Sequence, residues 1–424
     1  MSEIAVIDIG TTKIAFASAK IENSRVKINF MRSYPSAGLK KGKIVDMEAM
    51  STSIKRALQE IETTTGLKMK KAYVCASGND IKGIYSNAAV KVRKKEVTEQ
   101  DVDLAIEAAT AMRIPSDRQA VHILPVEFIV DGVNGIKDPV GMKALRLEAR
   151  VYIITASSSH IQNIVTCCNK AGIEVEEIVL QSIASAEATL TEHDREMGTV
   201  VVDIGGGSTD IAVFQDGYLK HVATYGVGGN HITNDLAIGL KIPFREAERI
   251  KTQFAVAMPD ISFGDLKFEK DKDEIEIVGI DKHSIKIPMT VIKEIVYARC
   301  EEILEIIKKE LDSIPLDSIS SAVFTGGTSL LQGFVSLAEG FLSIPARIGK
   351  PDAGLMEMAY ELGLDETPFN EEEIEGIYNP EFSSTVGTFI YVLKTGHYNE
   401  SNSGFEGVFN KILTWFEKGL KKFV

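Results

Sequence analysis

Two segments of this sequence place an aspartate just before a turn of glycine and hydroxyl residues. Residues 5–17 read AVIDIGTTKIAFA, and residues 201–214 read VVDIGGGSTDIAVF. Small residues in a turn leave backbone N–H groups free to converge on phosphate oxygens, and a carboxylate at a strand end can hold a hydrated divalent cation. One such turn is also typical of a plain β-hairpin. Two copies in one chain favour a site for phosphate and a cation.

The elements that must position these turns are two hairpins. Each segment has a β-branched run that ends in Asp-Ile-Gly, a small-residue turn and a second apolar run, which predicts a pair of strands. Asp8 and Asp203 lie too far apart in the chain for a short-period solenoid. The repeat therefore predicts two similar lobes that each open with a hairpin.

Two further segments carry candidate binding residues. Residues 321–334 (SAVFTGGTSLLQGF) predict a strand, a glycine turn and the start of a helix whose N-terminus suits a phosphate or a nucleoside. A βα loop with glycine for tight packing is the alternative. Residues 244–254 (FREAERIKTQF) predict a helix with Glu248 and Lys251 on one face. That pair is also typical of a solvated surface salt bridge.

The composition limits the class of protein. The chain has 424 residues, 44% hydrophobic and 25% charged, with a net charge of −13. These values are typical of a globular protein with roughly two to four folded units, and they argue against a body that coats nucleic acid. The four cysteines show no CxxC spacing, which favours a reducing cytosol over a disulfide framework or zinc site. No window approaches the ~18 apolar residues of a membrane span.

The order of these motifs resembles the actin, Hsp70 and sugar-kinase ATPase superfamily, in which two α/β lobes clamp ATP and Mg²⁺. The resemblance implies that Asp8 and Asp203 organise Mg²⁺ and water, and that Gln181 positions the attacking water. The implied nucleotide contacts are Gly10, Thr11, Thr12 and Lys13 in the first phosphate loop, Gly205, Gly206, Gly207, Ser208 and Thr209 in the second, Glu248 and Lys251 at ribose and adenine, and Gly326 and Gly327 in the adenosine motif.

Two segments resemble the connectors between the lobes of that superfamily. They are residues 180–188 (LQSIASAEA) and 383–393 (SSTVGTFIYVL). The small residues Ala184, Ala186 and Gly387 in these segments predict that two helices cross closely at a hinge.

Within that superfamily the inserts resemble one family, the cell-division protein FtsA. Residues 36–50 and 122–156 carry this resemblance. It implies an α/β, two-lobed actin-like ATPase fold with a small α+β (SHS2-like) subdomain inserted in the first lobe and a C-terminal amphipathic helix. The implied parts are a first-lobe core (1–83, 164–194 and 377–395), the insert (84–163), a second-lobe core (195–233 and 301–376), a small second-lobe subdomain (234–300), a flexible linker (396–407) and the terminal helix (408–424).

The residue pattern predicts the insert independently. Residues 97–112 (VTEQDVDLAIEAATAM) predict an amphipathic helix with Thr98 as its cap. The apolar positions of that helix are Val102, Leu104, Ile106 and Ala109. The basic run at 91–95 is typical of a solvated edge, with a partner contact as the alternative.

The last residues carry a second kind of chemistry. After a polar, glycine-containing stretch, residues 408–424 place apolar side chains at helical spacing, with lysines on the remaining surface. This pattern predicts an in-plane anchor for an anionic lipid membrane, and a helix docked on the body or in a partner's groove is the alternative. The predicted anchor residues are Phe409, Ile412, Leu413, Trp415, Phe416, Leu420 and Phe423, with Lys411, Lys418, Lys421 and Lys422.

The resemblance to FtsA also implies a function. It implies an ATP-binding protein with at most slow hydrolysis, which forms actin-like filaments and anchors FtsZ filaments, the Z-ring, to the cytoplasmic face of the cell membrane at the division septum. The implied partners are the FtsZ C-terminal tail, further copies of this chain, other division proteins and lipid, with no nucleic acid. Lys293 and Arg299 are candidates for contacts with carboxylates of that tail, and a surface pair on an amphipathic helix is the alternative.

Other functions on the same fold are the alternatives. The pilus-assembly actin homologue shares the insert, but it does not usually carry such a tail. A small-molecule kinase needs sugar-binding inserts, and a chaperone needs a β-rich domain after the core. Neither feature is present in the sequence.

Overall fold

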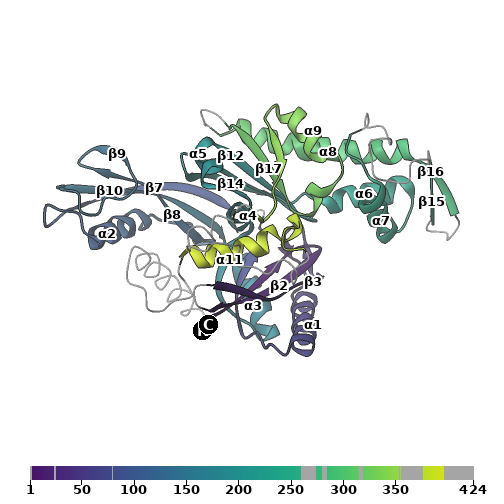
Figure 1. Cartoon of the computed structure of the whole chain (residues 1–424), viewed down its shortest axis with the longest axis horizontal. Helices are drawn as coiled ribbons and strands as arrows, with labels where there is room; N and C mark the ends of the chain where they lie inside the picture. The colour runs from purple at the N-terminus through teal and green to yellow at the C-terminus, as the bar shows by residue number, and fades with distance from the viewer. Residues whose placement is uncertain are drawn as a thin grey trace.

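The structure, a computed structural model, describes residues 2–22, 25–78, 80–258, 274–278, 284–314, 319–352, 354 and 376–395. Two α/β lobes lie side by side at its centre (Figure 1). A smaller unit of sheet and helix extends from one end of the long axis, and a two-stranded hairpin lies at the other end (Figure 1). The predicted terminal helix and its linker lie outside the described residues.

The two lobes are built on sheets of the same topology. The first lobe has the strand order β11-β6-β1-β2-β3, and the second has the matching order β18-β17-β12-β13-β14. In each sheet the hairpin strands are antiparallel and the strands beyond them are parallel. The strands are β1 (Ser2–Ile9), β2 (Lys13–Glu22), β3 (Arg25–Pro35), β6 (Lys71–Ala76) and β11 (Glu174–Leu180), and β12 (Thr199–Ile204), β13 (Thr209–Gln215), β14 (Tyr218–Tyr225), β17 (Ser321–Thr325) and β18 (Ala346–Ile348). The predicted repeat of hairpins and lobes is thus confirmed.

Both central strands end at the turns that the sequence singled out. Asp8 lies near the end of β1 opposite Ala15 of β2, and Asp203 lies near the end of β12 opposite Asp210 of β13. Ligands of open α/β sheets bind beyond the carboxyl ends of such strands. The topology therefore brings both turns to the same kind of sheet edge.

Three hydrophobic clusters form the cores of the described residues: one in the first lobe that also includes residues of β12, β13, β14 and β17, one in the second lobe and one in the insert. In the first lobe α1 (Met47–Thr65) and α3 (Ser158–Ala171) pack together beside the sheet (Figure 1). A short hairpin of β4 (Leu39–Lys40) and β5 (Lys43–Ile44) precedes α1. All four cysteines are buried and none forms a disulfide.

The insert is a four-stranded antiparallel sheet with one helix. Its strand order is β7-β10-β8-β9, with β7 (Lys82–Lys91), β8 (Arg118–Val130), β9 (Val133–Ile136) and β10 (Arg146–Ser157). The helix α2 (Glu99–Thr110) begins at the predicted cap, because the Thr98 hydroxyl accepts from the Asp101 N–H and the Asp101 carboxylate accepts from the Thr98 N–H. The sequence pattern placed Leu104 on the apolar face of this helix, but its side chain is 40% exposed, so that prediction was wrong. Val102 and Ile106, four positions apart, lie on the buried face, and a residue midway between them points away from it.

Helices and a hairpin complete the second lobe. The helices are α5 (Glu192–Met197), α6 (Gly229–Leu240), α7 (Phe244–Phe254), α8 (Met289–Asp312) and α9 (Phe334–Leu342), and the hairpin pairs β15 (Glu274–Val278) with β16 (Ser284–Pro288). The predicted helix over 244–254 is confirmed as α7. The helix expected directly after the Gly326-Gly327 turn is not there: a single 3₁₀ turn, η2 (Gly327–Leu330), follows, and α9 begins only at Phe334.

The two predicted connectors are helices that cross between the lobes. They are α4 (Gln181–Thr189) and α11 (Ser383–Thr395), which follows a short 3₁₀ turn, η3 (Pro380–Phe382). A Cβ added at Gly387 would lie 1.7 Å from the Ala184 carbonyl oxygen, so the crossing requires glycine at that position. Among the residues described, no helix is both long and apolar enough to cross a bilayer.

Candidate functional site

A cavity of about 570 Å³ lies where the two lobes meet. Residues of both hairpin turns line it, together with residues of α4, α6, α7, η2, η3 and α11. All but one of the predicted catalytic and nucleotide-contacting residues are among its walls: Asp8, Gly10, Thr11, Thr12, Lys13, Gln181, Asp203, Gly205, Gly206, Gly207, Ser208, Glu248, Lys251, Gly326 and Gly327. Thr209 is not in the wall; it is fully buried, and its hydroxyl donates to the Val227 carbonyl at 2.9 Å.

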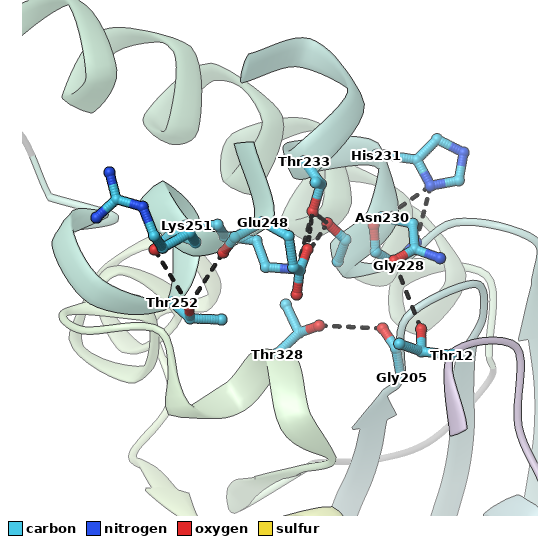
Figure 2. Close-up of polar contacts among 12 residues, drawn as sticks. Thr12, Gly205, Gly228, Asn230, His231, Thr233, Glu248, Lys251, Thr252 and Thr328 are labelled. Carbon is cyan, nitrogen blue, oxygen red and sulfur yellow. Dashed lines mark hydrogen bonds and ion pairs between the residues drawn. The ribbon is translucent and has the colours of Figure 1, made fainter. Parts of the chain in front are cut away.

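The two hairpin turns meet face to face at this cavity. A Cβ added at Gly206 would lie 1.8 Å from Thr12 Oγ1, and one at Gly207 would lie 2.3 Å from Thr11 Oγ1. Only glycine allows this approach, which brings the hydroxyls of the first turn against the backbone of the second. Figure 2 shows Thr12 beside Asn230 of α6, with 3.5 Å between its hydroxyl oxygen and the amide oxygen.

Three buried carboxylates lie at the ends of the hairpin strands. Hydroxyls of the connector helices hold two of them: Ser384 of α11 donates to Asp8 at 2.6 Å, and Ser185 of α4 donates to Asp203. The third, Asp210, accepts from Ser77 at 2.9 Å and from the Thr224 hydroxyl at 2.8 Å. Each carboxylate has one oxygen, Asp8 Oδ1, Asp203 Oδ1 and Asp210 Oδ2, that is buried and accepts no hydrogen bond from the described residues.

The burial of these carboxylates favours their protonated forms. Desolvation raises the pKa of Asp203 to about 7, with the neighbouring Asp210 and Asp8 charges adding to it and the Ser185 hydroxyl opposing it. Desolvation also raises the pKa of Asp210 to about 6, against hydrogen bonds from Thr224 and Ser77, and it raises the pKa of Asp8. A nearby cation stabilises the ionised form of a buried carboxylate, because it replaces the favourable interactions that water provides.

The carboxylates fit a hydrated magnesium ion better than a closed protein cage. The described residues hold no group of three or more His, Cys, Asp or Glu side chains that would enclose a metal. Mg²⁺ usually keeps several waters and takes one or two carboxylates, with phosphates completing its shell. The oxygens of Asp8 and Asp203 that lack a hydrogen-bond donor suit that role.

Gln181 lies beside one of these carboxylates. It is the first residue of α4 and is buried, and its Nε2 donates to Asp203 Oδ2 at 3.4 Å. Its side chain is part of the cavity wall. The Gln181 amide therefore lies in the cavity beside the Asp203 carboxylate.

The other end of the cavity is formed by α6, α7 and η2. Lys251 donates to Glu248 Oε2 at 2.8 Å, to the Thr233 hydroxyl at 3.0 Å and to the Gly229 carbonyl at 3.4 Å (Figure 2). The Lys251 side chain is only 13% exposed. The Glu248 side chain is 35% exposed, so the pair is a half-buried part of the cavity wall and not the solvated surface salt bridge that was the alternative. Thr328 of η2 donates to the Gly205 carbonyl at 3.0 Å and joins this end to the second turn (Figure 2).

Several residues in or next to the cavity are not among those predicted from the sequence. Asp210 is the clearest example. The sequence contained an indication of its role, because an aspartate in an apolar strand opposite Asp203 is unusual. Gly42, at the tip of the β4–β5 hairpin, is buried with φ of +73° and donates its N–H to Thr11 Oγ1 at 3.2 Å. Glu381 and Ser384 reach the cavity from η3 and α11, and nothing in the local sequence around them indicated it.

The candidate partner residues lie elsewhere, on α8. Lys293 is 8% exposed, and Arg299 donates to Asp235 of α6 at 2.5 and 3.1 Å and also pairs with Glu302. These two charges are thus integrated in the helix packing. The predicted membrane residues from Phe409 to Phe423 lie outside the described residues.

Solved structures show the class of protein. The PilM-PilN complex of type IV pilus biogenesis matches with a TM-score of 0.60 at 14% identity, over 92% of this chain and 98% of that chain. MreB5 of Spiroplasma citri, solved with ADP, matches with a TM-score of 0.55 at 13% identity, over 95% of this chain and 99% of that chain. With two lobes of repeated topology around one cavity, the chain has the actin-like ATPase fold.

Sequence comparisons then show the family. A family model described as "Cell division protein FtsA" matches residues 200–387, and one described as "SHS2 domain inserted in FTSA" matches residues 78–155. The cell division protein FtsA of Pseudomonas aeruginosa is 33% identical over 92% of this chain and 89% of its own length. That of Borreliella burgdorferi is 35% identical over 94% of this chain and 92% of its own. The chain belongs to the FtsA family of cell-division proteins.

These findings confirm the predicted two-lobed actin-like fold with its inserted subdomain and the resemblance to FtsA, while the predicted terminal amphipathic helix lies outside the described residues. They do not favour the pilus-assembly alternative, because the pilus match at 14% identity shows the fold alone, whereas the division proteins match at 33% and 35%.

Proposed function

We propose that this chain is an ATP-binding, actin-like division protein that polymerises and anchors FtsZ filaments to the cytoplasmic face of the cell membrane. The observation that carries the nucleotide part is the cavity between the lobes, in which two glycine and hydroxyl turns meet buried carboxylates. MreB5, which has the same fold, was solved with ADP and, in a second structure, with AMPPNP.

In this proposal each wall of the cavity binds a different part of ATP. The backbone N–H groups of both turns and the Lys13 ammonium bind phosphate oxygens. Glu248 and Lys251 face the ribose and adenine, while Gly326 and Gly327 let the backbone lie flat against the nucleoside. A volume of about 570 Å³ lies within the range of small-molecule pockets.

The acidic end of the cavity has the groups for slow hydrolysis. Bound Mg²⁺ would neutralise phosphate charge and orient the phosphates. The chain's own part is to hold water beside the phosphates, through Gln181, whose Nε2 donates to Asp203.

The membrane part of the proposal comes from the amphipathic pattern of residues 408–424. Each large apolar side chain there offers ~1.5–3 kcal/mol when fully buried, but burial at an interface is partial, so one copy should bind reversibly. Several copies in a filament would bind far more firmly through effective concentration. Polymerisation and membrane anchoring therefore support one another at the septum.

The partner part of the proposal places the FtsZ tail on the small subdomain of the second lobe. Ile238, Phe244 and Val291 are exposed apolar side chains of α6, α7 and α8, and α8 also carries Lys293 and Arg299. Because both cations are already integrated in the packing, an acidic tail has to compete with Asp235 and Glu302 for Arg299.

Co-sedimentation of FtsZ filaments with anionic liposomes tests this function. We expect the full chain to carry FtsZ into the liposome pellet in the presence of ATP. A chain that ends at residue 404 should bind FtsZ but leave it in the supernatant, and a K293E/R299E variant should bind liposomes without FtsZ. Liposome binding by the shortened chain would contradict the assignment of the anchor, and FtsZ recruitment by the charge-reversed variant would contradict the partner surface.

A further inference from the structure

Lys13 of the first turn is bound by the segment that leads into α11. Its ammonium donates to the Glu381 carbonyl at 2.7 Å and to Glu381 Oε2 at 3.2 Å, and it lies 4.2 Å from the centre of the Phe382 ring. These contacts connect residues 368 positions apart in the sequence. They link the turn between β1 and β2 of the first lobe to η3.

These contacts use most of the hydrogen-bonding capacity of the Lys13 ammonium. An ammonium has three donors, and here a carbonyl and a carboxylate take two of them while an aromatic face covers part of the group. The side chain is 27% exposed, so little of it faces free solvent. One donor therefore remains for a phosphate oxygen, and any further phosphate contact requires Lys13 to give up part of this arrangement.

Glu381 is an unusual residue for the wall of a polyphosphate site. Its side chain lines the cavity and is 41% exposed, and its carboxylate lies beside Gly327, where an added Cβ would be 3.6 Å from Oε1. A carboxylate at such a position competes with phosphate for the same cation.

We propose that Glu381 is a built-in competitor of nucleotide phosphate for Lys13, so that Lys13 changes partner when nucleotide binds. This inference rests on the proposed binding of ATP in the cavity. Phosphate draws the ammonium away from Glu381, and the Lys13–Glu381 ion pair reforms when phosphate leaves. The carboxylate thereby lowers the affinity for ATP and keeps nucleotide exchange reversible.

The change of partner by Lys13 also affects the hinge, which the connector helices α4 and α11 form. Glu381 is followed within three residues by Ser384, whose hydroxyl holds Asp8, and it is preceded by Pro380, whose carbonyl accepts from the Gly326 N–H at 3.2 Å. Release of Glu381 therefore acts on the short segment between the adenosine turn and α11. Occupation of the phosphate site is in this way coupled to the start of the connector helix.

The affinity of an E381Q variant for ATP and for adenosine tests the proposal. We expect E381Q to bind ATP about two- to fivefold more tightly than the wild type, the effect of losing a partly exposed ion pair. Adenosine affinity should not change, because adenosine has no phosphate for Lys13. The gain for ATP should shrink at high salt, since the competition is electrostatic.

The Lys13→Met background separates partner exchange from a general effect of charge. K13M should weaken ATP binding, and E381Q should add nothing in the K13M chain, because the competition acts only through Lys13. E62Q removes the ion pair between Glu62 of α1 and Lys68, which lies outside the cavity, and should leave both affinities unchanged. E381D keeps the charge and should bind ATP nearly as the wild type does, and thermal melts without nucleotide show that each variant is folded.

Four outcomes would overturn the inference. Unchanged ATP affinity in E381Q excludes competition, and weaker ATP affinity indicates that Glu381 holds the hydrated cation instead. Equal tightening for adenosine indicates a change of cavity shape, and tightening in the K13M background indicates general electrostatics. A wild-type chain that binds no ATP contradicts the proposed function itself, which makes that failure distinguishable from the others.

Discussion

At the scale of single residues, the buried carboxylates set the balance between stability and function. Asp203 is 2% exposed, and desolvation raises its pKa from 3.8 to about 7. Between these pH values the folded chain binds more protons at this group than the unfolded chain. The stability of the ligand-free protein should therefore fall as the pH rises through this window.

The D203N variant tests the loss of stability that ionisation of Asp203 causes, because asparagine does not ionise. We expect D203N to be more stable than the ligand-free wild type at pH 8, with a difference that shrinks towards pH 5, as measured by urea unfolding at several pH values. The same change should weaken MgATP binding, so stability rises as function is lost. D216N, at an exposed aspartate between β13 and β14, is the control for the change from aspartate to asparagine. A D203N effect that is constant with pH would contradict the raised pKa.

At the scale of elements, the connector helices join the hinge to the acidic site. Each helix holds a carboxylate of the lobe that it reaches: α4 leaves the first lobe and contacts Asp203, and α11 leaves the second lobe and contacts Asp8. A change of the crossing angle therefore moves both carboxylates. The crossing itself depends on the close approach at Gly387.

Substitution of Gly387 by alanine should separate the two helices. The added Cβ meets the Ala184 carbonyl at 1.7 Å, and we expect the free energy of unfolding to fall by about 1–3 kcal/mol, the usual cost of overpacking. Denaturant unfolding measures this change. The control is G340A in α9, where an added Cβ meets no atom within 4 Å and should stabilise the helix by about 0.5–1 kcal/mol. Equal effects of both variants would show that the crossing tolerates a side chain.

At the scale of the whole molecule, the insert contacts both lobes. It is continuous with the first lobe, and its Tyr85 hydroxyl donates to the Lys220 carbonyl of β14 at 3.0 Å, while Tyr152 accepts from the Val222 N–H at 3.3 Å. Lys137 of the insert also pairs with Glu196 of α5 at 2.8 Å. The insert lies next to β14 in Figure 1. Motion of one lobe against the other therefore has to move or strain the insert.

Residues 407–424 differ from the rest of the chain in the sign of their net charge. Four lysines and one glutamate after residue 406 give this end +3, which leaves −16 on the rest of the chain. Anionic lipid attracts the end and repels the body. We therefore expect filaments on an anionic lipid monolayer with ATP in electron micrographs, and none for the chain cut at residue 404. The absence of filaments with and without nucleotide would favour a monomeric adaptor.

Local patterns in the sequence determined the hairpins, the repeated lobes and the cap of α2. These features follow from strand periodicity and turn chemistry, which act over a few residues. Most residues of the cavity wall were implied by the resemblance to the actin-like superfamily. Tertiary structure alone decided the partners of the buried polar groups. Asp210 meets Ser77, and Lys13 meets Glu381, only because the sheets and connectors bring distant segments together. The burial of Lys293 was decided in the same way, because exposure depends on which faces of neighbouring helices pack together, and spacing along one helix does not encode that.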